Sequence, residues 1–246
     1  MNFIDKIAVV TGAAPGIGAA IAKRLYKDGA AYVALLDVSE EKVCAIAQGI
    51  DPTGKRAGGY LCNVADENSV NDVFQLLHDT YHKIDILVNN AGITRDAMFH
   101  KMTTAQWDGV MDVNINGMYF CCKAVVAGMR ERQYGKIVNL ASVSAFGNVG
   151  QTNYGASKGA VIGFTKCLAI EIARNHCTVN CIAPSYINTP MLQEVPPQTM
   201  ERFLSAIPMN RLGQPEELAA ATAFLCSDDS SFVTGECLVV SGGSYM

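Results

Sequence analysis

The sequence predicts an α/β protein: one doubly wound, mostly seven-stranded parallel sheet with helices on both faces. Three observations support this prediction. Short apolar runs without polar alternation, such as residues 7–10 and 179–183, are typical of parallel strands covered on both sides. Segments with helical apolar spacing, such as residues 67–81, separate these runs. The alternation continues without internal repeats or low-complexity linkers, so we expect a single domain over residues 1–246.

Composition limits the functional classes. With 246 residues, 50% hydrophobic and 17% charged, the chain can bury a large core as one α/β domain. A net charge of -4 and scattered basic residues make nucleic acid a poor partner. Apolar runs fall short of a membrane span and the first residues lack a signal-peptide pattern, so we expect a cytoplasmic enzyme without membrane attachment.

Cysteine and histidine usage does not indicate a metal site. The nine cysteines form an odd set without a Cys-x-x-Cys pair, which predicts reduced, mostly buried thiols. His78 and His82 are four residues apart and could share a helix face. Zinc needs further ligands that the sequence does not place, so we expect no bound metal.

The first strand, residues 7–10, leads into a glycine-rich turn and a helix. The turn reads Thr11-Gly12-Ala13-Ala14-Pro15-Gly16-Ile17-Gly18. Backbone N–H groups at such a turn and at the helix N-terminus can cradle a pyrophosphate, and missing side chains allow its approach. We therefore predict dinucleotide contacts at Gly12, Pro15, Gly16, Ile17 and Gly18. The alternative is an ordinary glycine-rich surface turn.

The second strand, residues 32–36, ends at Asp37, nineteen residues after Gly18. At this place in a βαβ unit, a carboxylate can accept both hydroxyls of the adenosine ribose and repel a 2′-phosphate. Two like charges about 4 Å apart cost roughly 4 kcal/mol at an effective dielectric of about 20. Pro15 offers no compensating cation, so NAD(H) is expected over NADP(H). The competing interpretation makes Asp37 the N-cap of the next helix, residues 40–50.

The third and fourth strands end in side chains suited to a nucleotide. Residues 58–62 lead to Asn63 and Val64, where an amide could meet the adenine edge. Residues 84–88 lead to Asn89-Asn90-Ala91-Gly92. Side-chain amides there can hold neighbouring loops through bonds to backbone, and Gly92 leaves room for a ribose.

A long helix over residues 104–132 contains Asn114. Asparagine is unfavourable inside a helix unless its amide is used, so Asn114 is either a buried anchor or part of a water relay from Lys158 to solvent. The sequence leaves both open. This helix and the one after Tyr154 are rich in Ala, Val, Met and Cys, which suggests packing between subunits.

The fifth strand, residues 136–141, ends beside Ser142, and a helix then begins near Tyr154 and Lys158. Tyr154 and Lys158 are four residues apart and share a helix face. A cation there favours phenolate, and a shift of roughly three units from a pKa of ~10 would allow proton exchange near neutral pH. Ser142 could hold a carbonyl or alcohol oxygen against the phenol. Alternatively, Tyr-x-x-x-Lys occurs here by chance.

After the sixth strand and Pro184, residues 185–213 form a long segment with several prolines and apolar side chains, including Met191. A segment of this length beside a proposed site predicts a mobile lid that carries the substrate pocket. A helix over residues 215–226 and a strand over residues 237–240 complete the chain.

The chain resembles the short-chain dehydrogenase/reductase family over nearly its whole length. The matching motifs are Thr11-Gly12-x-x-x-Gly16-Ile17-Gly18, Asn89-Asn90-Ala91-Gly92, Asn114, Ser142, Tyr154-x-x-x-Lys158, and Pro184 with Ile187 and Thr189. The resemblance implies a Rossmann-like fold, usually as a homotetramer. It also implies Tyr154 as acid/base, Ser142 orienting the substrate oxygen, Lys158 on the nicotinamide ribose, Asn114 in a proton relay, and Ile187 and Thr189 at the carboxamide.

Within the family, Asn89 to Asp96 and Gly150-Gln151-x-Asn153-Tyr154 resemble the bacterial 3-oxoacyl-acyl-carrier-protein reductases. Those usually carry an arginine at the position of Pro15 and use NADPH, whereas Pro15 with Asp37 indicates NADH. Their Pro-Gly pair is Pro184-Ser185 here, at the start of the lid.

Docking of an acyl carrier protein is less clear from the sequence. The basic positions on which such reductases dock their acidic carrier fall at Gln133 and Asn175, with Arg132 and Arg174 adjoining. Carrier docking therefore stays open.

We therefore expect an NAD(H)-dependent oxidoreductase that interconverts a secondary alcohol and a ketone, most similar to a 3-oxoacyl thioester reductase. Expected substrate contacts are Ser142, Gln151, Tyr154, Tyr186 and Met191. The first alternative is a catabolic dehydrogenase of a steroid, polyol or other small alcohol. A remote alternative is a non-catalytic nicotinamide-binding sensor.

Overall fold

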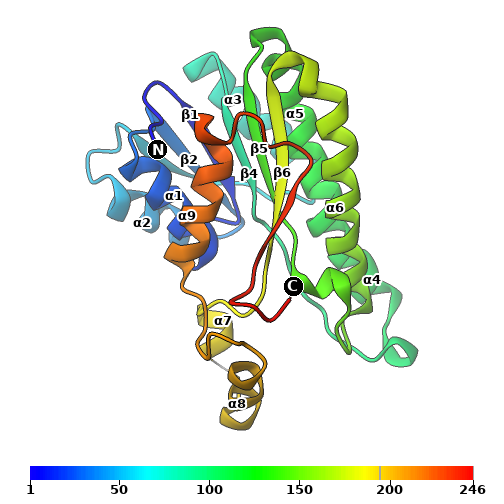
Figure 1. Cartoon of the computed structure of the whole chain (residues 1–246). Helices are drawn as coiled ribbons and strands as arrows, with labels where there is room; N and C mark the ends of the chain where they lie inside the picture. Colours follow the sequence, from blue (N-terminus) through cyan, green and yellow to red (C-terminus); the bar gives the residue numbers. More distant parts are fainter. Residues whose placement is uncertain (194, 246) are drawn as a thin grey trace.

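A parallel sheet of seven strands forms the centre of the described chain, in the order β3-β2-β1-β4-β5-β6-β7 (Figure 1). The computed structural model describes residues 1–193 and 195–245. The strands are β1 (Ile7–Thr11), β2 (Tyr32–Asp37), β3 (Ala57–Leu61), β4 (Ile86–Asn89), β5 (Gly135–Leu140), β6 (Cys177–Pro184) and β7 (Cys237–Val240). The order reverses between β1 and β4, and their carboxyl ends flank a crevice of the kind that binds ligands in doubly wound sheets.

Helices cover both faces of the sheet, as predicted (Figure 1). One face carries α1 (Ile17–Lys27), α2 (Glu40–Ile50) and α9 (Pro215–Cys226), and the other carries α3 (Glu67–Tyr81), α5 (Gly117–Arg132) and α6 (Thr152–Ile172). Three shorter helices, α4 (Thr104–Met111), α7 (Pro190–Gln193) and α8 (Pro197–Ser205), lie towards the carboxyl ends of the strands. None of the helices in the described ranges is long and apolar enough to cross a membrane.

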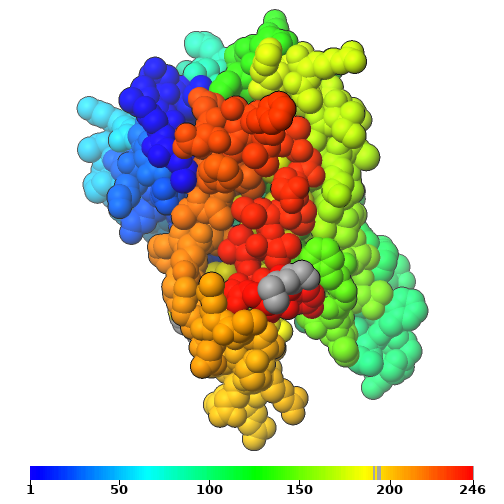
Figure 2. Space-filling view, in the orientation of Figure 1, coloured from blue at the N-terminus to red at the C-terminus, as the bar shows by residue number. Residues whose placement is uncertain are grey.

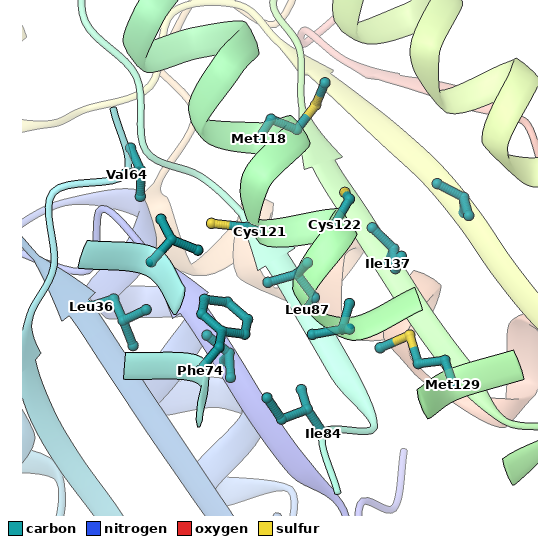
Figure 3. Packing of buried hydrophobic residues seen from close by; sticks show 14 of the residues in the cluster. Leu36, Val64, Phe74, Ile84, Leu87, Met118, Cys121, Cys122, Met129 and Ile137 are labelled. Carbon is teal, nitrogen blue, oxygen red and sulfur yellow. The ribbon is translucent and has the colours of Figure 1, made fainter. Parts of the chain in front are cut away.

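Alternate strand residues build two cores. Val9, Leu87 and Ile137 point into the layer with α3 and α5, whereas Val10 and Val88 point into the layer with α1 and α9. All five are fully buried. Figure 3 shows the first layer, where side chains of α5 lie over strands β4 and β5. Burial of each such side chain contributes about 1.5–3 kcal/mol, so the sheet edge that carries the loops is held rigidly.

The predicted bounds of the strands are confirmed to within two residues. Strand β4 begins at Ile86 rather than at residue 84. Here the Asp85 carboxylate accepts the Ile7 N–H at 2.9 Å, so a side chain takes over part of the strand pairing. Strand β3 spans Ala57–Leu61, one residue earlier than predicted. All nine cysteines are free thiols, as expected.

The predicted helix over residues 104–132 is continuous but contains a π-helical segment, Asp112–Asn116, between α4 and α5. The buried Asn114 lies in this segment. Its amide bonds to a neighbouring loop and to α6. Segments of this kind are common at functional sites.

Candidate active site

The loops that follow β1, β2, β4 and β5 bring most of the predicted site residues to one edge of the sheet. This edge carries the glycine-rich turn, Asp37, the Asn90 to Gly92 loop and Ser142, while α6 presents Tyr154 and Lys158 beside it. The segment that the sequence predicts to be a lid, residues 185–213 and called the lid below, follows β6 at the same edge (Figure 1).

Asn90 and its neighbour Ala91 fix the glycine-rich turn through four hydrogen bonds. Its side-chain Nδ2 donates to the carbonyls of Thr11 at 3.1 Å and Gly12 at 2.7 Å. In return, the Thr11 hydroxyl oxygen accepts the N–H groups of Asn90 and Ala91, each at 3.1 Å. The predicted role of these amides in holding neighbouring loops together is therefore confirmed.

The turn has the close packing of a dinucleotide-binding loop. A Cβ added at Gly12, which has φ +61, would lie 2.7 Å from the Ala91 Cα, and one at Gly18 would lie 2.3 Å from the Gly12 carbonyl oxygen. A Cβ at Gly16 would meet only the Thr189 methyl group, at 4.0 Å. The first turn of α1 has no side-chain cap, so its N–H groups can serve an anion. These residues fit a pyrophosphate.

Asp37 lies at the end of β2, against this turn. Its Oδ2 accepts the Ala14 N–H at 3.0 Å and its Oδ1 accepts the Ser39 N–H at 3.1 Å. Ser39, and not Asp37, is the N-cap residue of α2, so the competing capping interpretation is wrong. An ionised carboxylate has about four lone-pair positions, which leaves acceptor capacity for ribose hydroxyls.

Asn63 and Val64 follow β3 at the same edge. Asn63 is exposed, and its Oδ1 accepts the Ala65 N–H at 3.1 Å. Val64 is buried and lies against Gly117 of α5. This placement is compatible with the predicted adenine contact, which stays a prediction.

Asn114 is locked between a loop and α6. Its Oδ1 accepts the Ile93 N–H at 2.8 Å, and its Nδ2 donates to the Ile93 carbonyl at 3.1 Å and the Ser157 hydroxyl at 3.0 Å. These contacts make Asn114 a buried anchor. Because both amide donors and the amide oxygen are engaged, a water relay at this residue would have to use its backbone carbonyl.

Gly92 keeps the space next to Asn114 and Lys158 open. A Cβ at Gly92 would lie 3.3 Å from the Asn114 Oδ1 and 3.4 Å from the Lys158 Nζ. A side chain at this position would therefore press on the Asn114 amide and the Lys158 ammonium group.

Ser142, Tyr154 and Lys158 lie together at the end of β5. Ser142 is buried, and its Oγ accepts the Ser144 N–H at 3.1 Å. Lys158 is 3% exposed, and its Nζ lies 5.6 Å from the Tyr154 ring centroid and donates to the Leu140 carbonyl at 2.5 Å. Burial lowers the pKa of Lys158 to about 8.

That Lys158 makes the Tyr154 phenol acidic stays a prediction for the site with its dinucleotide bound, because in the protein alone burial of the phenol dominates. Burial raises the pKa of Tyr154, a hydrogen bond with Ser142 opposes that rise, and the negative charge of Asp96 adds to it. The ammonium group of Lys158 is directed to the Leu140 carbonyl, while desolvation disfavours the phenolate. Burial of the Tyr154 phenol and the charge of Asp96 both favour its protonated form.

Asp96 lies close to the predicted site but is not among the residues predicted for it. Its Oδ2 accepts from the Gln151 Nε2 at 2.9 Å, and Gln151 lies three residues before Tyr154. We expect Asp96→Asn to lower the pKa of Tyr154, because a nearby negative charge disfavours phenolate. In the reduction direction, the alkaline limb of the kcat/KM profile should then move to lower pH.

The control for this prediction is Asp108→Asn, which removes an exposed charge from α4. Asp108 is not among the groups that shift the pKa of Tyr154. An alkaline limb that stays in place in Asp96→Asn, or moves equally in both variants, would contradict the assignment.

The expected substrate residues are only partly brought together. Gln151 lies near Ser142 and Tyr154, where its Oε1 accepts from the Ser144 hydroxyl at 2.9 Å. Tyr186 instead stacks on Phe203 of the lid, with ring centroids 4.3 Å apart. Tyr186 lines a cavity of about 460 Å³ between the lid and the carboxyl-terminal segment, shown in red in Figure 2. The side chain of Met191 lies outside the described residues.

The two ends of the lid are joined. Ile187 pairs with Gly213, and the Asn188 N–H donates to the Gly213 carbonyl at 2.8 Å. Ser185, which follows Pro184, donates its hydroxyl to the Ser241 carbonyl at 3.1 Å. The serine that replaces the usual glycine thus ties the lid to the segment after β7.

Comparisons with known proteins agree with this geometry. A family model described as enoyl-(acyl carrier protein) reductase matches residues 12–245. The 3-oxoacyl-[acyl-carrier-protein] reductase of Thermotoga maritima is 41% identical over 244 residues, 99% of each chain. The Vibrio harveyi enzyme of the same name is 42% identical over 247 residues, 100% of each chain. A (2S)-[(R)-hydroxy(phenyl)methyl]succinyl-CoA dehydrogenase subunit of Thauera aromatica is 40% identical over 243 residues, 99% of this chain and 98% of that one.

Proposed function

Because the chain belongs to the short-chain dehydrogenase/reductase family and is therefore an oxidoreductase of CH-OH or keto groups, we propose that it reduces a 3-oxoacyl thioester. The observation that carries the proposal is the cluster of Ser142, Tyr154 and Lys158 beside a dinucleotide-type turn. We further propose that the chain forms one dinucleotide-binding domain in which residues 185–213 are the substrate lid.

In this proposal a nicotinamide dinucleotide supplies the hydride. The glycine-rich turn and the α1 N-terminus bind its pyrophosphate, Asp37 and Asn63 the adenosine, and Lys158 the nicotinamide ribose. Further contacts come from Val64, Asn90, Ala91, Pro184, Ile187 and Thr189. Ser142 and Tyr154 hold the substrate oxygen, and Tyr154 gives it a proton. Gln151 and Tyr186 complete the proposed substrate contacts.

A protonated Tyr154 suits the general-acid step that reduction of a ketone requires. Burial raises the pKa of its phenol and so favours the protonated hydroxyl. A protonated phenol can act as general acid towards the alkoxide that forms when a ketone is reduced. Oxidation of an alcohol would need the phenolate, which burial disfavours.

We propose NAD(H) as the preferred dinucleotide. Asp37 lies within hydrogen-bonding distance of the glycine-rich turn, where an adenosine 2′-phosphate would place a second negative charge. At about 4 Å and an effective dielectric near 20, the repulsion is roughly 4 kcal/mol. We expect kcat/KM to be about 1,000-fold higher with NADH than with NADPH.

The matched variant is Asp37→Asn, which removes the charge and keeps an acceptor oxygen. This variant should reduce the ratio of kcat/KM with NADH to kcat/KM with NADPH, mainly by raising kcat/KM with NADPH. A higher kcat/KM with NADPH in the unaltered protein would remove Asp37 from this role.

The thioester proposal is tested with purified protein, NADH and a panel of substrates. We expect acetoacetyl thioesters to be reduced faster than steroid ketones, keto sugars or small ketones. The alternative, a catabolic dehydrogenase of a secondary alcohol, is favoured by one observation, the Thauera aromatica relative named a dehydrogenase. Faster NAD reduction with an alcohol than NADH oxidation with a thioester would support that alternative.

A non-catalytic nicotinamide sensor is the remaining alternative. Its prediction is NADH binding without turnover on the whole panel. The joint presence of Ser142, Tyr154, Lys158 and Asn114 at one edge of the sheet argues against it.

The relatives of Thermotoga and Vibrio are named for acyl-carrier-protein substrates, but carrier docking at Gln133 and Asn175 is not part of our proposal. Both lie near the amino ends of β5 and β6, opposite the edge that carries Tyr154 in the same chain. The Arg132 guanidinium donates one hydrogen bond to the Ile84 carbonyl at 2.7 Å, so part of its donor capacity is used within the chain. Comparing kcat/KM for carrier-bound and coenzyme A thioesters tests whether the protein recognises the carrier or only the acyl thioester.

We also propose a homotetramer in the cytoplasm. Ile170 of α6 is 80% exposed and Tyr119 of α5 is 44% exposed, so these helices present apolar side chains that a neighbouring subunit could cover. The nine free thiols suit a reducing compartment. Sedimentation equilibrium should give a mass near four chains, and a monomer at micromolar concentration would contradict the assembly.

A further inference from the structure

The side chain of Asn153, the residue before Tyr154, has no solvent exposure. Its Oδ1 accepts the Tyr154 N–H at 2.8 Å. Its Nδ2 donates to the carbonyl of Arg95 at 2.9 Å and to that of Gln106 at 3.1 Å. One side chain therefore joins the first turn of α6, the loop after β4 and helix α4, and all three of these contacts are to backbone.

These contacts replace the missing cap of α6. Helix α6 begins at Thr152, and its N-cap residue Gln151 makes no capping bond with its side chain. The Gln151 side chain is engaged with Ser144, Asn148 and Asp96 instead. The Tyr154 N–H is one of the groups that a helix leaves without an intrahelical partner, and Asn153 supplies the acceptor.

Asn153 makes a second connection between the loop after β4 and α6, next to the one that Asn114 makes. Asn114 ties Ile93 to Ser157, and Asn153 ties Arg95 to Tyr154. Ser157 lies four residues after Asn153, so the two connections hold successive turns of α6 to one loop. Tyr154 lies between these two connections on α6, and its phenol lies near Ser142.

We infer that Asn153 is a positioning residue that fixes the Tyr154 hydroxyl against Ser142 and the reacting oxygen. This inference rests on the proposed function. Asn153 does not touch the substrate in it, because its amide is fully engaged with backbone groups. Its effect is on the direction and rigidity of the first turn of α6, and a displacement of about 1 Å at a catalytic group can reduce turnover about 100-fold.

The test compares Asn153→Leu, which keeps the volume and loses all three bonds, with Asn153→Asp, which keeps the acceptor for the Tyr154 N–H. The control is Asn116→Leu, an exposed asparagine whose amide bonds only within its own helix, to Asp112. Turnover is measured with NADH and acetoacetyl coenzyme A, NADH affinity by fluorescence, and the isotope effect on kcat with 4-deuterated NADH.

We expect kcat of Asn153→Leu to fall about 10- to 100-fold, with the dissociation constant of NADH within about threefold of the unaltered protein. The isotope effect should rise, because misplacement slows the chemical step relative to product release. Asn153→Asp should also lose turnover, because its carboxylate would face the Arg95 and Gln106 carbonyls, and Asn116→Leu should lose none. A purely structural role would lower the active fraction without raising the isotope effect.

Three outcomes would overturn the inference. They are an unchanged kcat, a loss of kcat without a change in the isotope effect, and failure of both variants to fold. If the unaltered protein itself does not oxidise NADH with any substrate of the panel, the proposed function fails instead, and the two failures are thereby distinguished.

Discussion

Tyr154→Phe is expected to reduce turnover by about 1,000-fold or more while leaving NADH binding nearly unchanged. General acid catalysis typically contributes between about 100- and 10,000-fold. The phenol is the group beside Ser142 that can deliver a proton, and phenylalanine keeps the ring that fills the site. The loss should therefore appear in kcat, with little change in the dissociation constant of NADH.

The matched control is Tyr26→Phe, which removes a hydroxyl from a partly buried ring in α1. Its turnover should equal that of the unaltered protein. Residual activity of Tyr154→Phe above about a tenth would show that another group supplies the proton and would refute the assigned role.

Lys158→Met is expected to remove turnover and to weaken NADH binding together. The lysine is buried, and its ammonium group donates to the Leu140 carbonyl and lies over the Tyr154 ring. Methionine keeps much of the length of the side chain but leaves that buried carbonyl without its donor, a loss of about 1–3 kcal/mol. We expect kcat/KM to fall at least about 1,000-fold, with a weaker NADH affinity, because in our proposal Lys158 acts on both the Tyr154 phenol and the nicotinamide ribose.

Lys166→Met on the exposed side of the same helix is the control, and both of its constants should stay unchanged. Tyr154→Phe should leave the NADH affinity unchanged, whereas Lys158→Met should weaken it, and this difference separates the two roles. If Lys158→Met lowers kcat alone and binds NADH normally, the proposed contact with the ribose is wrong.

Much of the fold follows from local signals. The apolar runs without alternation identify the parallel strands, and α2, α3 and α9 have the bounds that their spacing and flanking residues predict. The glycine-rich turn and Asp37 could be paired from the sequence because a βαβ unit fixes where the second strand ends. Their contact through the Ala14 N–H confirms that reasoning.

Properties that depend on three-dimensional surroundings were not predictable. The shift in the pKa of Tyr154 follows from its burial and from Asp96, which is far away in the sequence. The spacing of Tyr154 and Lys158 indicated a shared helix face but not the direction of the ammonium group, which turns towards Leu140. Asn153 gave the same signal as Asn114, a poor helix former near a helix, and reasoning from propensity could have found it.

The most direct test of the account follows a labelled hydride. The protein is incubated with NADH deuterated at C4, each face in turn, and a 3-oxoacyl thioester, and the product is analysed by mass spectrometry and NMR. We predict that deuterium from one face appears at the carbinol carbon, one atom per NADH consumed, and that Tyr154→Phe gives almost no product. Product without deuterium from either face, or NADH consumption without a hydroxyacyl product, would contradict hydride transfer at this site.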